Sequence, residues 1–246
     1  MPQQDTPSTK KGRATRDRIV AVAADLMYRH GVAGTSTPAV RDAAGVSSSQ
    51  IYHYFADKDD LTRAVIAFQT EAILSNQAPS LARLDSLAAL RAWRDVVVDA
   101  ARQDNGAGGC PLGSLSSELS DDHPWARDAL AASFTAWSEA IRSGLSAMAA
   151  NGALPPGADP ARLALALLAA VQGGLILAQA QHSTDALEAG LDTVIAHIQD
   201  HAVQALPLLV HGFSSLAESP FWGRPGRGWG RVGPGLSSPG RAARRG

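Results

Sequence analysis

The chain has 246 residues, of which 45% are hydrophobic, enough for one sizeable globular unit or a small domain joined to a larger one. Ala and Leu are abundant and β-branched runs are scarce, which predicts an all-α protein. The single Cys110 excludes an intrachain disulfide framework and agrees with a cytoplasmic location. The net charge is only −1, so charge alone says little about function.

The N-terminal part of the chain begins with a polar segment, residues 1–12, that contains Pro and Gly and predicts a disordered arm. Residues 1–18 have no apolar core, so we expect no signal peptide. A first helix is expected from Thr15 to His30, with Gly31 ending it. Its apolar stripe consists of Ile19, Val22, Ala23, Leu26 and Met27.

Two short helices follow and are separated by a glycine. We expect Thr37 to cap the first, with Pro38 at the first helical position, where its missing N–H costs nothing. Gly45 is expected to end that helix in a left-handed conformation. Ser47 and Gln50 match a capping box that opens the second.

The next residues predict how this unit closes. Ile51 and Phe55 lie four apart and should face inward. Asp57 should cap a fourth helix, on which Leu61, Val65 and Phe68 form the next apolar stripe.

The sequence after residue 84 also predicts helices, followed by a C-terminal segment of different composition. The expected helices cover residues 84–103, 114–120, 124–150, 159–181 and 185–204. Polar and small residues interrupt the apolar helix 159–181, so we read it as a buried helix and expect no membrane association. Residues 207–246 hold 9 Gly, 5 Pro and 6 Arg, which predicts a disordered tail. The expected domains are therefore an arm (1–12), a head of short helices (13–61), a helical body (62–206) and a tail (207–246).

Three short helices with a glycine at the tight turn describe a helix-turn-helix. Gly45 permits the turn, Val46 fills the space beneath it, and Ser47 caps the helix whose N-terminal half would enter the major groove. A basic front end agrees with this, because residues 1–41 carry 7 Lys and Arg against 3 Asp and Glu, whereas residues 61–204 carry 8 against 15.

Residues 16–61 resemble the DNA-binding head of the tetracycline-repressor (TetR) family. The resemblance rests on Ala43-Ala44-Gly45-Val46-Ser47, on Ile51-Tyr52-His53-Tyr54-Phe55, and on Asp57-Lys58-Asp59-Asp60-Leu61. Ser49 stands where such proteins often have Gly, and Val40-Arg41 where they usually have Ile-Ala. The stretch Gly109-Cys110-Pro111-Leu112-Gly113-Ser114-Leu115, followed by Glu118-Leu119, looks like a ligand-binding-domain motif of one TetR subgroup.

Six residues are candidates for contact with DNA. Tyr52 can donate to a phosphate or pack on a thymine methyl, and Lys58 can pair with a phosphate. Gln50 can read adenine, but its capping role competes with that contact. The full set is Thr37, Ser48, Gln50, Tyr52, His53 and Lys58.

The body contains candidates for ligand binding, each with a plainer alternative. Phe68, Trp93, Phe134 and Trp137 can line a small-molecule pocket or simply pack in the core, and Gln172 can anchor a ligand or pair between helices. Cys110 can sense redox state, but we favour a small buried hydrophobe because Lys, Arg and His are absent nearby in sequence. His197 and His201 lie four apart, as metal ligands can, but no third ligand is evident and we favour surface histidines.

The resemblance implies a homodimer that binds a near-palindromic DNA operator and releases it on binding a small apolar or aromatic effector. The two last helices would form the dimer interface through Leu167, Leu168, Val171, Leu175, Leu191, Val194 and Ile198. We expect no cofactor, no metal and no enzymatic activity, because the sequence shows no nucleophile–base pair, P-loop or dinucleotide loop. The alternative is a helical DNA-binding or architectural protein without an effector.

Overall fold

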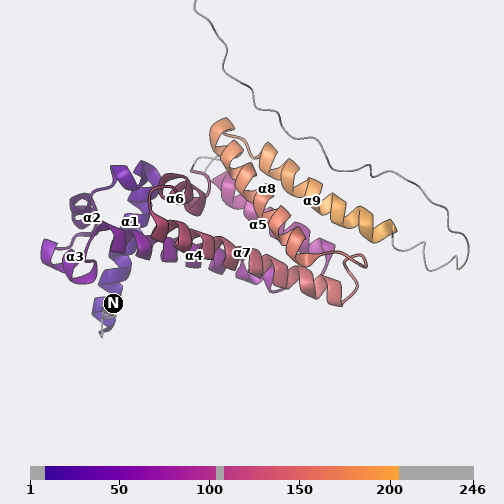
Figure 1. Ribbon diagram of the computed structural model, residues 1–246, viewed down its shortest axis with the longest axis horizontal. Coiled ribbons are helices and arrows are strands. Elements are labelled where there is room, and N and C mark those ends of the chain that lie inside the picture. Colours follow the sequence, from indigo (N-terminus) through magenta and orange to yellow (C-terminus); the bar gives the residue numbers. More distant parts are fainter. Residues whose placement is uncertain (1–8, 104–107, 205–246) are drawn as a thin grey trace, which may run out of the picture. The chain divides into compact units, whose positions relative to one another are not determined.

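The computed structural model describes residues 9–103 and 108–204, and in these ranges the chain forms helices and no strands (Figure 1). The helices are α1 (Lys10–Gly34), α2 (Thr37–Ala44), α3 (Ser48–Tyr54), α4 (Lys58–Leu81), α5 (Leu87–Gln103), α6 (Pro111–Leu119), α7 (Pro124–Ala150), α8 (Pro160–Gln181) and α9 (Asp185–Gln204). This confirms the expected all-α class. The predicted tail (207–246) and the first eight residues of the predicted arm lie outside the described residues.

Helix α1 begins earlier than the sequence predicted. The Thr9 hydroxyl accepts from the Gly12 N–H at 3.1 Å, so Thr9 is the N-cap and residues 10–12 are helical rather than part of an arm. Gly31 has φ 73° and breaks the helical path as expected, but one further turn continues to Gly34.

The helix-turn-helix has the predicted turn. Gly45 adopts the left-handed conformation (φ 62°, ψ 43°) that ends α2. The capping box is present, since the Ser47 hydroxyl accepts from the Gln50 N–H and the Gln50 Oε1 accepts from the Ser47 N–H. The cap of α2 is a correction: Ser36, not Thr37, accepts from the Ala39 N–H at 3.2 Å.

One hydrophobic core runs through the head and the body. In the head, α1 carries Ile19 and Ala23 against Val40, Ile51 and Phe55, all buried. Helix α1 also packs on α4 and α6, so it belongs to both parts. Expected inward positions Leu61 and Val65 of α4 are buried, whereas Phe68 is 40% exposed and leaves that stripe.

The body is built on α4 and α7, with α8 against α7 and α9 against α8 and α5 (Figure 1). Helices α8 and α9 lie so close that a Cβ on Gly174 would be 2.5 Å from the Leu187 Cα. Helix α5 begins three residues after the expected start at 84, and α6 begins three residues before the expected start at 114. In α6, Pro111 occupies the first turn, where its fixed φ opens the helix.

Helix α8 is the one helix of the described ranges that is long and apolar enough to cross a membrane, and 33% of its most apolar window is buried. Its buried side packs on α7 and α9. Its opposite side exposes large apolar residues, with Leu165 and Ile176 each 61% exposed and Leu177 46% exposed. The reading of α8 as a fully buried helix is therefore correct for one face only.

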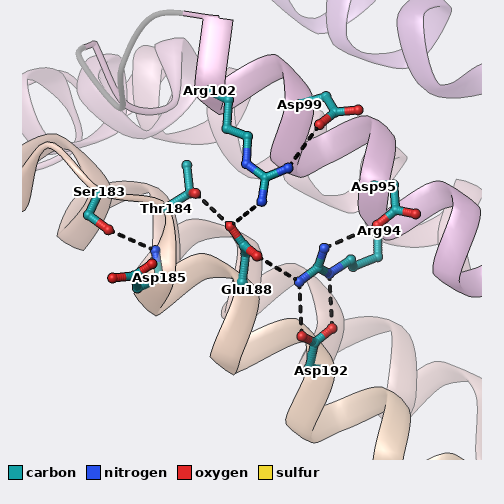
Figure 2. Close-up of polar contacts among 9 residues, drawn as sticks. All are labelled: Arg94, Asp95, Asp99, Arg102, Ser183, Thr184, Asp185, Glu188 and Asp192. Carbon is teal, nitrogen blue, oxygen red and sulfur yellow. Dashed lines mark hydrogen bonds and ion pairs between the residues drawn. The ribbon is translucent and has the colours of Figure 1, made fainter.

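A charged cluster joins α9 to α5 (Figure 2). The Arg94 guanidinium donates from Nε and Nη2 to the Asp192 carboxylate, both at 2.9 Å, and from Nη2 to Glu188 at 3.2 Å. Glu188 also accepts from Arg102 at 2.7 Å and from the Thr184 hydroxyl at 2.6 Å. The Arg94 side chain is 14% exposed but the Asp192 side chain is 59% exposed, so this bidentate pair is shielded from solvent on the arginine side only.

The hydrogen bond from the Thr184 hydroxyl, followed by those from Arg102 and Arg94, lowers the pKa of Glu188 below its ordinary value. A carboxylate whose pKa is depressed by folding stabilises the fold above its unfolded pKa. That stabilisation is lost as the pH falls through the depressed value.

We predict that Arg94→Ala lowers the free energy of unfolding by about 1–2 kcal/mol at pH 7, because charge-assisted hydrogen bonds between α5 and α9 are lost. Urea denaturation at constant protein concentration measures the change. The deficit should shrink as the pH falls through the depressed pKa of Glu188, because the neutral carboxyl no longer pairs with Arg94 in the unmodified protein.

The matched control is Arg142→Ala, since Arg142 pairs with Glu139 on the same exposed side of α7. That variant should unfold like the unmodified protein. Equal effects of the two substitutions would mean that the α5–α9 cluster is no stronger than a surface ion pair.

Candidate DNA-binding surface and effector cavity

Helix α3 presents one side to solvent and anchors the other. Ile51 is buried and Phe55, which follows the helix, is buried with it, so Tyr52 and His53 are turned outward, whereas Tyr54 is half-buried against the core. Tyr52 is 59% exposed and His53 is exposed, with the His53 ring packed edge-on against Tyr54 at 4.9 Å between centroids. An exposed phenol on a helix that follows a left-handed turn can reach a phosphate or a base edge.

Two of the candidate DNA contacts already have partners within the protein. The Gln50 Oε1 accepts from the Ser47 N–H at 2.9 Å, so the oxygen already takes part in the helix cap. The side chain is exposed, and its amide N–H groups are the donors left for a contact with DNA. The Ser48 hydroxyl accepts from Arg41 at 3.3 Å, which links α3 to α2. Both side chains are exposed at the start of α3, so a contact with DNA would compete with these bonds.

The remaining two candidates lie at helix starts. Thr37 is the first residue of α2 and Lys58 the first of α4, and both are half-buried. A helix N-terminus attracts an anion such as a phosphate. Sequence reasoning placed Phe55 in the core but did not foresee its contact with a cation: the Arg16 guanidinium lies over the Phe55 ring, 5.4 Å from the ring centroid.

A cavity of about 490 Å³ lies between the head helix α1 and the body. Its lining comes from α1, α4, α5, α7 and α8 and from the segment that opens α6, so residues from 21 to 175 meet there. Of the five predicted pocket residues, Phe68 and Trp137 line this cavity. Phe134 is not part of the lining and packs half-buried against the core.

Trp93 and Gln172 are also absent from the lining. Trp93 is fully buried, because its large ring fills the core between α4 and α5. Gln172 lies beside α6: a Cβ on Gly113 would come within 3.0 Å of the Gln172 Oε1, and the Gln172 Nε2 is buried with no hydrogen-bond partner. Neither side chain therefore lines this cavity, and a ligand contact at these two positions stays a prediction.

Gln77 is a polar residue of the cavity wall that sequence reasoning missed. It is 8% exposed, and its Oε1 accepts from the indole N–H of Trp93 at 2.9 Å and from that of Trp137 at 3.0 Å. A lone Gln in a long polar-and-apolar helix gives no signal in sequence, because its two partners lie 16 and 60 residues away.

Cys110 lines the cavity and is buried. Burial raises the pKa of its thiol, which favours the neutral form and supports the interpretation as a small hydrophobe. Within the described part of the chain, no three His, Cys, Asp or Glu side chains come together as metal ligands. His197 is exposed on α9, and the His201 side chain lies outside the described residues.

Glu118 of α6 holds the end of α1. Its carboxylate accepts from the Val32 N–H at 2.8 Å and from the Ala33 N–H at 2.6 Å, directly after the break at Gly31. These N–H groups begin the last turn of α1, where a negative charge is favourable. The sequence motif that contains Glu118 was noted, but this role was not foreseen, because the bond spans more than 80 residues.

The predicted dimer contacts fall mostly inside a single chain. Leu167, Val171, Leu191 and Ile198 are at most 1% exposed, and Leu168 is 7% exposed, so they cannot form an interface between chains. They form the intrachain contact of α8 with its neighbours instead. Leu175 and Val194 are half-buried, and Leu175 also lines the cavity. The exposed apolar residues of α8 are on the opposite face.

Known proteins resemble this chain in both parts. Residues 19–65 match the family model described as bacterial regulatory proteins of the tetR family, and residues 86–194 match that of the tetracyclin repressor-like C-terminal domain. A TetR transcriptional regulator from Chloroflexus aurantiacus J-10-FL has a similar crystal structure, with a TM-score of 0.69 and 30% identity over 78% of this chain and 97% of that one.

Two curated relatives are transcriptional regulators. An uncharacterized HTH-type regulator in the lacX 3′ region of Lactococcus lactis is 29% identical over 182 residues, 73% of this chain and 91% of the relative. The HTH-type transcriptional repressor KstR2 of Rhodococcus jostii is 30% identical over 92 residues, 37% of this chain and 44% of that repressor. TetR regulators bind operator DNA, typically as homodimers, and respond to small molecules through the C-terminal domain. With a helix-turn-helix head and a helical body that both match, the chain belongs to the TetR family of transcriptional regulators.

Proposed function

We propose that this protein is a dimeric, cytoplasmic repressor that leaves a near-palindromic operator when a small, largely apolar effector fills its cavity. The observation that carries the proposal is the position of the cavity: its wall includes Ala21, Ala24 and Tyr28 of α1, a helix that also forms the core of the DNA-binding head. A ligand there touches the head and the body at once. Repression, rather than activation, is supported by the relative that is named a repressor.

The structure offers a route from the cavity to the head through α6. Cys110 and Pro111, at the start of α6, line the cavity, and Glu118, near its end, binds the backbone of Val32 and Ala33. A ligand that favours another position of α6 would change the head through this carboxylate. Effector and DNA would then oppose one another through their different affinities for the two states.

The exposed face of α8 supports dimerisation through this helix. Leu165, Ile176 and Leu177 are exposed apolar residues, and a Cβ on Gly173 would meet no atom within 4 Å, so a second chain can approach closely there. An isologous contact of α8 and α9 with their copies would bury this face. Two-fold symmetry would place the α3 helices about 34–36 Å apart on successive major grooves, which accounts for a near-palindromic operator.

The alternative, a DNA-binding or architectural protein without an effector, shares the head and the dimer. That function does not account for the cavity between α1 and the body. Ligand-dependent release from DNA separates the two functions.

Tyr52→Ala should weaken operator binding at least tenfold, because the exposed hydroxyl and the ring that would contact the DNA are both lost. The measurement is a gel-shift titration on a duplex selected from a random library by the unmodified protein. Tyr52→Phe separates the contributions, since it removes only the hydroxyl. Unchanged binding by Tyr52→Ala in a dimer of normal stability would rule out α3 as the DNA-reading helix.

Ile176→Glu should convert the dimer into a monomer, because a charge would be buried in the proposed interface. Sedimentation equilibrium measures the mass. Thr135→Glu, on an exposed part of α7, should leave the dimer unchanged. A dimeric Ile176→Glu protein would place the interface elsewhere.

Glu118→Gln should speed amide hydrogen exchange at Val32 and Ala33 and reduce operator affinity several-fold, because one charged acceptor pair becomes a single neutral acceptor. Glu139→Gln removes the same charge from an exposed site on α7 and serves as the control. If exchange quickens at the two amides while DNA binding is unaltered, Glu118 stabilises α1 without positioning the head.

A further inference from the structure

We infer that Gln77 is a fixed hydrogen-bond donor for the effector, and that the effector is an uncharged ring compound with a carbonyl-type acceptor oxygen. This inference rests on the proposed function of the cavity and specifies the ligand that it takes.

The orientation of the Gln77 amide follows from its partners. The same side-chain atom lies 2.9 Å from the Trp93 Nε1 and 3.0 Å from the Trp137 Nε1. An indole N–H can only donate, so the atom between two of them must be the amide oxygen. Two donors from two different helices, α5 and α7, therefore fix the orientation of the Gln77 amide and prevent an exchange of its oxygen and nitrogen positions.

With the oxygen committed, the other end of the amide is the Nε2 group, which has two donors. No hydrogen bond from this nitrogen is present among the described residues, although the side chain is 8% exposed and lines the cavity. Because the oxygen already serves the two indoles, both Nε2 donors remain available to a ligand oxygen in the cavity that Gln77 lines. The site is thus built to bind an oxygen that accepts.

The charge of the cavity excludes an anion. Among the described residues that line it, none is Lys, Arg or His, and the one charged residue is Asp25. The Asp25 carboxylate pairs with Arg29 at 2.8 Å, so its charge is already balanced. A ligand carboxylate or phosphate would be desolvated here without a cation to receive it.

The rest of the wall matches a ring system. Phe68, Ile73, Val97, Trp137 and Val171 contribute aromatic and aliphatic surface, and the volume of about 490 Å³ lies in the range of pockets for small organic ligands. A flat apolar skeleton would pack against these side chains while its oxygen meets Gln77. A ketone, lactone or amide on one or two rings has this chemistry.

Four probes with one skeleton test the inference by calorimetric titration of the full chain at pH 8: 1-tetralone, tetralin, 1-aminotetralin and tetralin-1-carboxylate. The unmodified protein should bind 1-tetralone about tenfold more tightly than tetralin, the size of effect expected from one hydrogen bond to a fixed donor. Tetralin-1-carboxylate should not bind measurably. Absence of 1-tetralone binding, or equal affinity for tetralin, would overturn the inference.

Two variants identify the donor. Gln77→Glu keeps an acceptor for both indoles but replaces the donor by a charged oxygen, so the preference should change from 1-tetralone to 1-aminotetralin. Gln77→Met removes the donor without adding charge, so 1-tetralone and tetralin should bind equally. Gln103→Glu makes the same exchange at an exposed position outside the cavity lining and should retain the ketone preference. A retained ketone preference in both Gln77 variants would assign the contact to another residue.

Release of the selected operator duplex by 1-tetralone, followed in the same samples, distinguishes this inference from the proposed function. Ketone binding that depends on Gln77 without any release of DNA would support Gln77 as the donor and overturn the effector-controlled repressor. Release of DNA by 1-tetralone that is unchanged in both Gln77 variants would support the effector-controlled repressor and overturn the assignment of Gln77 as the donor.

Discussion

The hydrogen bonds of two indole groups to one buried amide oxygen constrain the centre of the body. Gln77 of α4 is the common acceptor, so α4, α5 and α7 can pack together only in an arrangement that brings Trp93 and Trp137 to the same point. A buried polar group is costly unless it is satisfied, and this one specifies a single packing of three helices. Gln77 and Trp137 also line the cavity, so the same hydrogen bonds hold part of its wall in place.

Helix α1 connects this centre to the DNA-binding surface. One part of it packs in the head against Val40 and Ile51, another lines the cavity, and its last turn is held by Glu118 from α6. The break at Gly31 separates the long rigid part from that last turn. A helix with three sets of contacts cannot shift at one of them without altering the others, which gives a physical basis for communication between ligand and DNA.

Local rules of sequence predicted the head well and the body less well. The left-handed Gly45, the capping box of Ser47 and Gln50, and the cap at Asp57 depend on neighbours within four residues. The cavity depends on contacts between distant helices, so hydrophobic periodicity could not separate Trp93 in the core from Trp137 in the wall. The same limit explains the dimer residues: an apolar helix such as α8 can bury either face, and only the packing of α7 and α9 reveals which face the chain itself covers.

The exposed apolar face of α8 has a consequence for stability. In the proposed dimer, association buries Leu165, Ile176 and Leu177 and lowers the free energy of the folded chains, so folding and dimerisation would be thermodynamically linked. The melting temperature then depends on protein concentration, and a regulator made in few copies has the smallest reserve. In such a dimer the folded fraction falls on dilution, so the amount of active regulator would rise more steeply than the amount of chain that is made.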